Sequence, residues 1–301
     1  MTTLHLGIDL GATNIKWAVV ARDGDAWTTR STGQTPTVAG AGADAVVDRM
    51  VAIGRRAKAE HAVRSVGVGV PGLYDAARGV TLLLPNLPGA WIEQPVVEPL
   101  GQALDLPVAL INDARAFGLA ELRLGAGRGA ATMIGLTLGT GVGGVIAVAG
   151  RVHHGHDGTA GEVGHQTLEP DGPECTCGNR GCLEAYVRAD RVAAACGTDT
   201  AAAAVAAARG GDTRALDGFA EIGAWLGIGI ANLVVALTPD RVILGGGVAG
   251  AGDLLLDPIR AELRRRVHVT ALDRVELCLA ELGTGAGAIG AAVHGAEVDP
   301  T

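Results

Sequence analysis

Alternating apolar and polar positions divide the first part of the chain into strands and helices. Apolar runs at residues 4–9 and 17–21 flank a turn that contains Gly-Ala-Thr-Asn, which predicts a β-hairpin. Apolar and charged residues then recur at helical spacing over residues 41–61, and a β-branched run at 63–70 ends at Pro71-Gly72. The pattern continues with a helix, a strand and a helix, predicted at residues 95–104, 108–111 and 114–124.

The second half repeats this outline, which indicates two related α/β halves. Apolar runs at residues 132–137 and 145–149 flank the turn LGTGVGG and predict another hairpin. The longest apolar stretch, 224–237, contains Asn232 and is shorter than the roughly 20 residues of a membrane span, so it predicts a buried helix. The remaining predictions are a helix or mobile surface segment at 201–208, a strand at 241–244 followed by a glycine turn and a helix, and a helix at 285–294.

Composition and charge narrow the class of protein. Apolar residues make up 48% of the 301 positions and aromatic residues only 3%, which is typical of an α/β core built from Ala, Val, Leu and Ile. This length favours two domains. The 24 Lys and Arg against 32 Asp and Glu give a net charge of −8 without a basic block, so a nucleic-acid partner is not expected.

The beginning of the chain and its cysteines bear on location. The segment MTTLHLGIDLG enters a strand-like run at once, which predicts neither a signal peptide nor a preceding DNA-binding domain. We therefore expect no membrane partner. Five cysteines, three of them clustered, favour a reducing cytoplasm over a disulfide framework. Cys196 and Cys278 are expected to belong to the core.

One histidine and three cysteines form the most specific chemical pattern. His165, Cys175, Cys177 and Cys182 offer an imidazole and three thiolates, a ligand set that suits tetrahedral zinc. The short Cys-x-Cys and Cys-x4-Cys spacings let one loop wrap an ion. The alternative is buried thiols with a surface histidine, but three of five cysteines within eight residues favour zinc.

Three glycine-rich turns follow predicted strands, at residues 9–14, 138–144 and 244–248. Glycine allows a backbone to approach an anion and to point successive N–H groups at it, whereas hairpins also need glycine for geometry alone. Each turn is therefore a weak signal, and only their joint occurrence favours phosphate binding. None matches the Walker pattern or a dinucleotide-binding GxGxxG with its later acid, which disfavours P-loop NTPases and dinucleotide dehydrogenases.

Two aspartates stand at the ends of predicted strands. Asp9 is suited to hold Mg²⁺ through water beside nucleotide phosphates, or it serves only to form the turn. Asp113, preceded by the amide of Asn112, is placed to accept the proton of a substrate hydroxyl that attacks a phosphoryl group. Asp113 is also a preferred residue for the N-cap of the helix at 114–124, and the two roles are compatible.

Taken together, these segments resemble the ROK family of sugar kinases and repressors, within the actin-like ATPase superfamily. DLGATNIK and LTLGTGVGGVI look like its two phosphate loops, VGVPG its strand-to-turn near the sugar, INDARAFGLAE its catalytic segment and LGGGVAG its adenosine segment. GEVGH and CTCGNRGCLEA look like its zinc- and sugar-binding segment. The resemblance covers essentially the whole chain.

The resemblance implies an α/β fold of two actin-like (ribonuclease H-like) domains with an active-site cleft between them. The small N-terminal domain would comprise residues 1–113 and about 286–301, and the large domain residues 114–285 with the zinc-binding loop 165–182. Two departures from the family stand out. Ala12 replaces a glycine of the first phosphate loop, and Arg115 and Phe117 follow Asn112-Asp113 where small or amide residues are usual.

The resemblance also implies residue roles. Asp113 would be the catalytic base, and His165 would bind zinc through one ring nitrogen and sugar through the other, in a structural zinc site. The implied sugar-binding set is Gly72, Asn112, Asp113, Glu162, His165 and Glu184. The implied nucleotide-binding set is Asp9, Gly11, Thr13, Asn14, Gly139, Thr140, Gly141, Gly246 and Gly247.

These roles predict a hexose kinase that transfers the γ-phosphoryl group of ATP, with Mg²⁺, to the 6-hydroxyl of a glucose-like sugar. An amino-glucose such as kanosamine or an N-acetylhexosamine is an alternative substrate, and polyphosphate an alternative donor. A sugar-responsive regulator or a catalytically silent sugar-binding protein would be a different class of function. The family also leads us to expect a homodimer or homotetramer.

Overall fold

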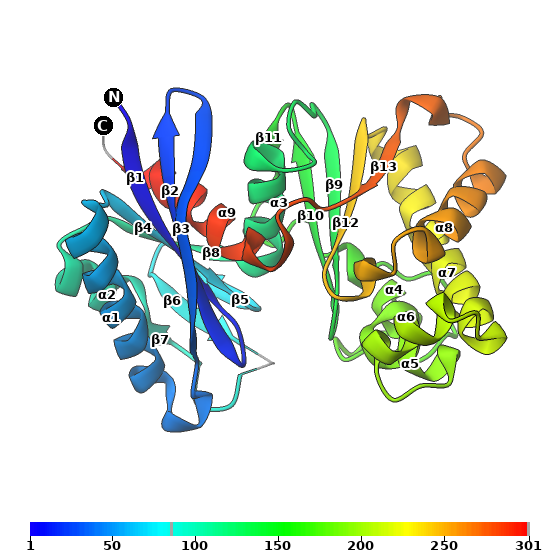
Figure 1. Cartoon of the computed structure of the whole chain (residues 1–301), viewed down its shortest axis with the longest axis horizontal. Helices are drawn as coiled ribbons and strands as arrows, with labels where there is room; N and C mark the ends of the chain where they lie inside the picture. Colours follow the sequence, from blue (N-terminus) through cyan, green and yellow to red (C-terminus); the bar gives the residue numbers. More distant parts are fainter. Residues whose placement is uncertain (85–86, 300–301) are drawn as a thin grey trace. The chain divides into compact units, whose positions relative to one another are not determined.

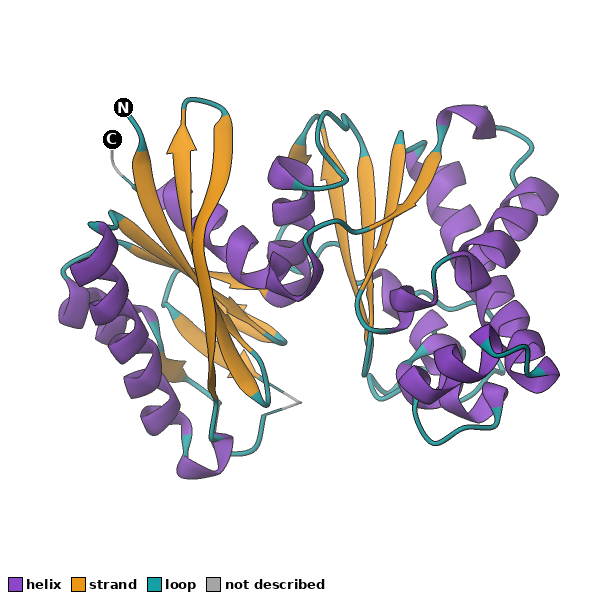
Figure 2. Cartoon of the chain, in the orientation of Figure 1, coloured by secondary structure: helices purple, strands orange, loops and turns teal. Residues whose placement is uncertain are grey.

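In the computed structural model, which describes residues 1–84 and 87–299, the chain forms two compact units. Unit 1 comprises Met1–Gly125 and Thr284–Thr301, and unit 2 comprises Ala126–Gly283. Each is built on a five-stranded sheet with helices, as the α/β composition predicts (Figure 2). The first division lies twelve residues beyond the predicted residue 113, because the helix that follows Asp113 packs within unit 1.

The sheet of unit 1 has the order β3-β2-β1-β4-β8 (Figure 1). The predicted hairpin is present as β1 and β2, which pair antiparallel, and β4 and β8 run parallel to β1. Sequence reasoning missed β3, a polar edge strand of Thr, Ser, Gln and Arg without an apolar run. The strands are β1 (Thr3–Leu10), β2 (Asn14–Asp23), β3 (Ala26–Pro36), β4 (Ser65–Val70) and β8 (Val108–Asn112).

Helices cover both faces of this sheet. On one face lie α1 (Ala43–His61) and α2 (Val97–Leu104), whose apolar positions pack on β1 and β8. On the other lie α3 (Asp113–Leu124) and α9 (Ala286–Gly295). The contact with α9 is very close, because a Cβ added at Gly7 or Gly67 would overlap α9 carbonyl oxygens at 1.8 and 1.7 Å. This packing explains why α9 consists mostly of Ala and Gly.

A small antiparallel sheet completes unit 1. Its strands were not predicted, since they are only two to four residues long: β5 (Leu73–Asp75), β6 (Val80–Leu83) and β7 (Gln94–Pro95). Short 3₁₀ helices are η1 (Ala39–Ala41), η5 (Gly283–Gly285) at the boundary between the units, and η6 (Ala296–Val298).

The sheet of unit 2 has the order β11-β10-β9-β12-β13. The predicted second hairpin is present as β9 and β10, and β12 runs parallel to β9. The strand β10 begins at Val142 rather than near residue 145, so two of the turn glycines pair within the sheet. The strands are β9 (Met133–Leu138), β10 (Val142–Val148), β11 (Arg151–Val152), β12 (Arg241–Gly245) and β13 (Glu276–Leu279).

The helices of unit 2 pack around α7 (Thr213–Leu237). This helix begins eleven residues before the predicted start at 224, because the N-cap Asp212 accepts the Ala215 N–H well ahead of the apolar run. It is long and apolar enough to cross a membrane by length and composition, and it buries Phe219, Leu226 and Ile230 inside the unit.

The other elements of unit 2 surround this helix. The alanine-rich segment is a helix, the first of its two predicted states. These elements are α4 (Leu183–Val187), α5 (Ala189–Cys196), α6 (Ala201–Arg209), α8 (Asp253–Arg266), η2 (Val163–His165), η3 (Val248–Ala251) and η4 (Leu272–Arg274).

Candidate functional site

The predicted polar residues of unit 1 lie at the carboxyl ends of its parallel strands. Asp9 on β1 is level with Gly69 on β4, and Val70 on β4 is level with Asn112 on β8. Parallel strands that end at one edge of a sheet form the usual ligand-binding edge of α/β proteins. The fold therefore brings Asp9, Gly72, Asn112 and Asp113 to one edge of the sheet.

Asn112 is the N-cap of α3, which corrects the prediction that Asp113 caps this helix. The Oδ1 atom of Asn112 accepts hydrogen bonds from the N–H groups of Ala114 at 3.0 Å and Arg115 at 3.3 Å. Its Nδ2 donates to the Gly72 carbonyl at 3.3 Å. Asp113 is instead the first helical residue, where the N-terminal end of the helix dipole stabilises a carboxylate.

Asp9 carries the clearest electrostatic signature of unit 1. Burial raises the pKa of its carboxyl to about 7, the negative charge of Asp113 adds to the shift, and Lys16 opposes it. The side chain keeps some accessible surface, yet α9 presses on it, since a Cβ at Gly287 would lie 2.6 Å from the Asp9 carboxylate. Two carboxylates that interact in this way favour a bound cation.

The turn between β1 and β2 holds Gly11, Thr13 and Asn14. The Gly11 N–H donates to the Asn14 carbonyl at 3.1 Å, and a Cβ at Gly11 would lie 2.7 Å from that oxygen. Thr37, the residue directly after β3, fixes the turn: its hydroxyl donates to the Gly11 carbonyl at 2.6 Å and its N–H to the Thr13 carbonyl at 2.9 Å. Sequence reasoning missed Thr37, because its role depends on the unpredicted β3.

The two glycine turns of unit 2 lie side by side. They follow β9 and β12, which are neighbours in the sheet, and a Cβ at Gly246 would lie 2.3 Å from the Leu138 carbonyl oxygen. At Gly139 and Gly247 an added Cβ would meet no atom within 4 Å, so the packing of the chain itself does not require glycine there. Open backbone at two adjacent turns suits an approaching phosphate. Thr140 lies between the glycines of the first turn.

The predicted cysteine-histidine group comes together in unit 2. His165 ends η2, and the cysteines lie on the loop that leads into α4. Sγ of Cys175 is 3.6 Å from Nδ1 of His165, Sγ of Cys177 is 3.8 Å from Sγ of Cys182, and one ligand atom from each residue lies within 4.8 Å of the others. Zn–S bonds of about 2.3 Å in a tetrahedron imply sulfur atoms about 3.8 Å apart, so the set fits zinc.

The surroundings of the thiols also favour a metal. Burial raises the pKa of Cys182 to about 12, with contributions from Cys177 and Cys175, and burial raises the pKa of Cys175. The pKa of Cys177 is lowered, mainly by a hydrogen bond from the Asn179 N–H. Asn179 also donates Nδ2 to Sγ of Cys182 at 3.4 Å, a contact that no sequence motif signalled. A divalent cation would offset the cost of three neighbouring thiolates.

Removal of a metal held by these four residues should destabilise the protein. Because structural zinc contributes directly to folding, we expect a strong chelator to lower the Tm of the purified protein and weaken sugar binding together. Metal analysis before and after chelation, with Tm and sugar affinity measured on both samples, checks this. Addition of Zn²⁺ should restore both, with release of protons from the thiols. A verified metal-free protein with unchanged Tm and sugar affinity would contradict the expectation.

The two predicted sugar-binding glutamates differ in burial. Glu184, in the first turn of α4, is buried, and its Oε2 accepts the Val142 N–H at 2.8 Å while its Oε1 accepts the Thr176 hydroxyl at 3.2 Å. Glu162 is exposed and precedes η2. Both lie in the unit 2 segment that carries the four predicted zinc ligands, whereas Asn112 and Asp113 belong to unit 1.

The residues that depart from the family pattern belong to the packing of unit 1. Arg115 and Phe117 are both buried in α3, at 2% and 7% exposure. The charge of Arg115 also acts on Tyr74. Burial raises the pKa of the Tyr74 hydroxyl, and this increase is partly offset by Arg115 and by a hydrogen bond with the Asn112 backbone. Ala12 does not have a positive φ, so replacement of glycine there causes no backbone strain.

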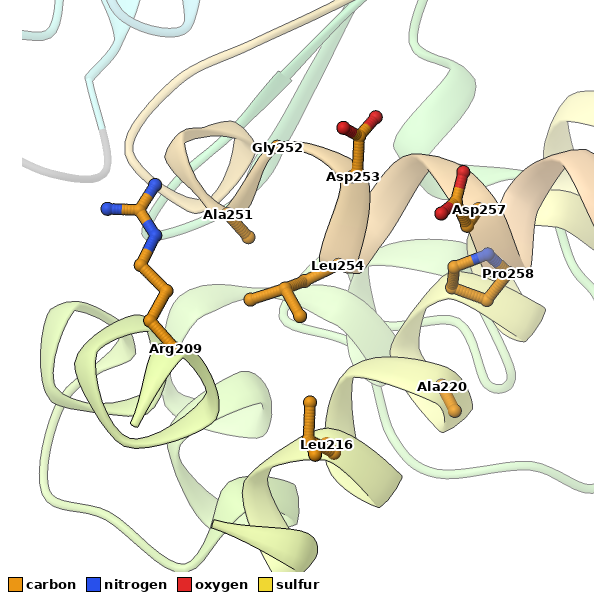
Figure 3. A pocket seen from close by; sticks show the side chains of 9 residues that line it. All are labelled: Arg209, Leu216, Ala220, Ala251, Gly252, Asp253, Leu254, Asp257 and Pro258. Carbon is orange, nitrogen blue, oxygen red and sulfur yellow. The ribbon is translucent and has the colours of Figure 1, made fainter. Parts of the chain in front are cut away.

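A cavity of about 600 Å³ opens on the surface of unit 2 between α6, α7 and α8 (Figure 3). Its floor is apolar, formed by Leu216, Leu254 and Pro258, and Arg209, Asp253 and Asp257 stand around it. None of the predicted site residues lines it. Ala251, which lines the cavity, comes shortly after the turn that holds Gly246 and Gly247. The predicted nucleotide-binding turn and the cavity are therefore close in sequence.

Comparison with known proteins decides the family. The sequence model of the ROK family matches residues 5–296. The chain belongs to the ROK family. It is 34% identical to the glucokinase of Streptomyces coelicolor over 320 aligned positions, covering 99% of both chains. ROK sugar kinases of this kind have two actin-like domains, which confirms the predicted fold class.

Solved ROK structures match the whole chain. The glucokinase of Streptomyces griseus, in complex with glucose and AMPPNP, is 34% identical, with a TM-score of 0.80 over 98% of this chain and 99% of that one. The ROK hexokinase of Thermus thermophilus is 35% identical, with a TM-score of 0.82 over 99% and 98%. The family resemblance expected from the motifs is thereby confirmed over nearly every residue.

Proposed function

We propose that this ROK protein is an ATP-dependent glucokinase, which transfers the γ-phosphoryl group of ATP to the 6-hydroxyl of a glucose-like hexose. Glucokinase relatives at 34% identity over the full length and a relative solved with glucose and AMPPNP support this activity. An amino-sugar kinase of the same family is the second candidate for the acceptor. Nothing in the fold of the described residues favours a purely regulatory role over catalysis.

The observation that carries the proposal is the position of Asp113 at the edge of the unit 1 sheet. Asp113 is the first residue of α3, directly after Asn112, and the negative charge of its carboxylate raises the pKa of Asp9. Phosphoryl transfer requires positioning, charge neutralisation and a proton acceptor for the attacking hydroxyl. In the proposed reaction Asp113 takes the proton of the sugar 6-hydroxyl as that oxygen bonds to phosphorus and the bond to the leaving ADP oxygen breaks.

The remaining polar groups divide between the two substrates. The turns at Gly139 and Gly247 offer open backbone to the phosphates, and the turn of Gly11, Thr13 and Asn14 is the third proposed phosphate contact. The Asp9 carboxylate would hold Mg²⁺ through water, an ion that neutralises phosphate charge when bound. The Oδ1 atom of Asn112 caps α3 and its Nδ2 donates one N–H to the Gly72 carbonyl, so the second N–H of this amide would bind a sugar hydroxyl. Gly72, Glu162, His165 and Glu184 are the other proposed sugar ligands.

Zinc has a structural role in this proposal. The four ligands leave no open position, so the ion does not bind substrate. With Nδ1 of His165 facing the cysteines, Nε2 remains available to the sugar, and the metal would fix the orientation of the ring. We expect the enzyme to act in the cytoplasm as a homodimer or homotetramer.

A coupled assay of ADP release tests the proposed function. Purified protein with ATP and Mg²⁺ is offered glucose, mannose, fructose, glucosamine, kanosamine and N-acetylhexosamines. Glucose should give the highest kcat/KM, and 6-deoxyglucose, which lacks the acceptor hydroxyl, should give none. Highest activity with an amino-hexose would shift the substrate assignment to the second candidate. Absence of ADP release with every hexose would refute the kinase itself.

A further inference from the structure

One carboxylate joins two functional loops of unit 2. The Oε2 atom of Glu184 accepts the N–H of Val142, the first residue of β10 after the glycine turn 139–141, at 2.8 Å. Its Oε1 accepts the hydroxyl of Thr176 at 3.2 Å. Thr176 lies between the proposed zinc ligands Cys175 and Cys177. Glu184 therefore connects the cysteine loop directly to a proposed phosphate-binding turn.

The contact with the glycine turn is close as well as hydrogen-bonded. A Cβ at Gly141 would lie 2.5 Å from Oε2 of Glu184, so the carboxylate occupies the space beside the turn. Because Glu184 is buried, it has little freedom to turn without moving its neighbours. A change in the orientation of this carboxylate would therefore disturb the Gly141-Val142 backbone.

The negative charge near Oε1 of Glu184 makes the hydrogen bond from the Thr176 hydroxyl important for the orientation of this carboxylate. Zn²⁺ with three thiolates carries a net charge of −1, and Sγ of Cys175 is 3.8 Å from Oε1 of Glu184. A zinc-bound thiolate has no proton to donate, so this sulfur would face the carboxylate as a like charge. Thr176 places a hydroxyl donor on the same oxygen, and hydrogen bonds to ionised groups are among the stronger ones in proteins. Arg188 supplies a compensating positive charge, since its pKa is raised mainly by Asp190 and also by Glu184.

We propose that Thr176 is a positioning residue, whose hydroxyl orients the Glu184 carboxylate so that one group both binds sugar and supports the phosphate turn. The proposal rests on the function proposed above, in which Glu184 binds a sugar hydroxyl. Sugar and nucleotide affinity are then coupled through Glu184: a sugar that holds the carboxylate in place also holds the Gly141-Val142 backbone. No motif assigns a role to the residue between the two cysteines.

Two substitutions separate the hydroxyl from the shape of the side chain. Thr176→Val removes the donor at nearly equal volume, whereas Thr176→Ser retains it. We expect Thr176→Val to raise the glucose KM by about three- to tenfold, the range for one lost hydrogen bond, with kcat within about twofold. Thr176→Ser should retain the wild-type KM. Thr159→Val is the matched control, because the Thr159 hydroxyl donates to the Asp157 carboxylate in an exposed turn without a proposed ligand.

Binding measurements test the coupling. The affinity for a non-hydrolysable ATP analogue is measured with and without glucose by calorimetry, together with the zinc content of each variant. Glucose should tighten analogue binding in the wild type and in Thr176→Ser, and less so in Thr176→Val at unchanged zinc content. An active kinase whose Thr176→Val variant matches the wild type in both KM and coupling would overturn the inference. So would equal loss of zinc from the Val and Ser variants, which would assign the side chain to loop folding. Wild-type protein that binds both ligands without turnover would instead refute only the proposed function.

Discussion

Replacement of Asp113 by asparagine is expected to lower kcat by about 10²- to 10⁴-fold, with the sugar KM within about threefold. The amide cannot accept the proton of the attacking hydroxyl, but it can still accept the Ala114 N–H that Oδ1 of Asp113 accepts at 2.8 Å. The start of α3 should therefore persist, because its cap is Asn112 rather than Asp113. The loss would lie in the chemical step and not in folding or binding.

Steady-state kinetics with glucose and ATP, combined with Tm, measure this effect. Asp105→Asn is a suitable control, since Asp105 is an exposed aspartate of the same unit at the C-cap of α2, in a left-handed conformation that asparagine tolerates. The control should retain wild-type kcat and KM. If Asp113→Asn kept kcat within tenfold of the wild type, another group would have to accept the proton.

The position of Asn112 shows why a motif gives residue types more readily than their roles. The sequence places an amide and a carboxylate at the end of a strand, and either residue can cap the following helix. The structure assigns the cap to Asn112, whose Oδ1 accepts two backbone N–H groups. The helix cap therefore does not require the carboxylate of Asp113. This division depends on backbone angles at the end of β8, which the order of residues does not specify.

Elements with a strong apolar period were predicted, and elements held by other means were not. The strands β1, β4, β8, β9 and β12 are apolar runs, and their predicted bounds are close to those observed. The edge strand β3 alternates exposed and half-buried residues, most of them polar, and among the described strands it pairs with β2, so its stability comes from the sheet that it joins. The start of α7 was missed because its first turns are set by the Asp212 cap and not by hydrophobicity.

The same distinction applies to the candidate site. Cysteine and histidine are diagnostic at short spacing, so the group of His165 and three cysteines was predicted before the structure brought it together. The supporting residues Thr37, Thr176 and Asn179 act through one or a few hydrogen bonds to partners distant in the sequence or on a loop. Such residues have no signature of type or spacing, and only the three-dimensional arrangement shows them.

Asp9→Asn is expected to stabilise the ligand-free protein above pH 7 while it abolishes productive nucleotide binding. Burial and the charge of Asp113 raise the pKa of Asp9 to about 7 in the folded protein, whereas an aspartate in the unfolded chain titrates near 4. Between these values the folded state retains a proton that the unfolded state has released. The free energy of unfolding therefore decreases as the pH rises from about 4 to about 7.

The size of this effect follows from the shift. About three pKa units correspond to about 4 kcal/mol at pH 8, an upper bound because Asp9 keeps some access to solvent. Asparagine has no charge to bury, so the variant should lack this part of the pH dependence. The difference in Tm between variant and wild type should grow from pH 5 to pH 8, measured without nucleotide or Mg²⁺. Asp23→Asn, at the exposed end of β2, should show no such growth.

Binding of Mg²⁺ and ATP should make the wild type more stable than Asp9→Asn, the reverse of the order expected for the ligand-free proteins. A Mg²⁺ ion that enters with ATP would supply the positive charge that the Asp9 carboxylate lacks in the free protein, so Mg²⁺ and ATP together should raise the Tm of the wild type by mass action. The variant has no carboxylate to hold the hydrated ion and should gain little. A ligand-free Asp9→Asn protein no more stable than the wild type at pH 8 would show that the Asp9 charge costs little. An equal Tm gain with Mg²⁺ and ATP in both proteins would remove Asp9 from the metal site. A carboxylate that destabilises the ligand-free protein but is required for function is expected where the proposed reaction needs two carboxylates, Asp9 and Asp113, at one edge of a sheet.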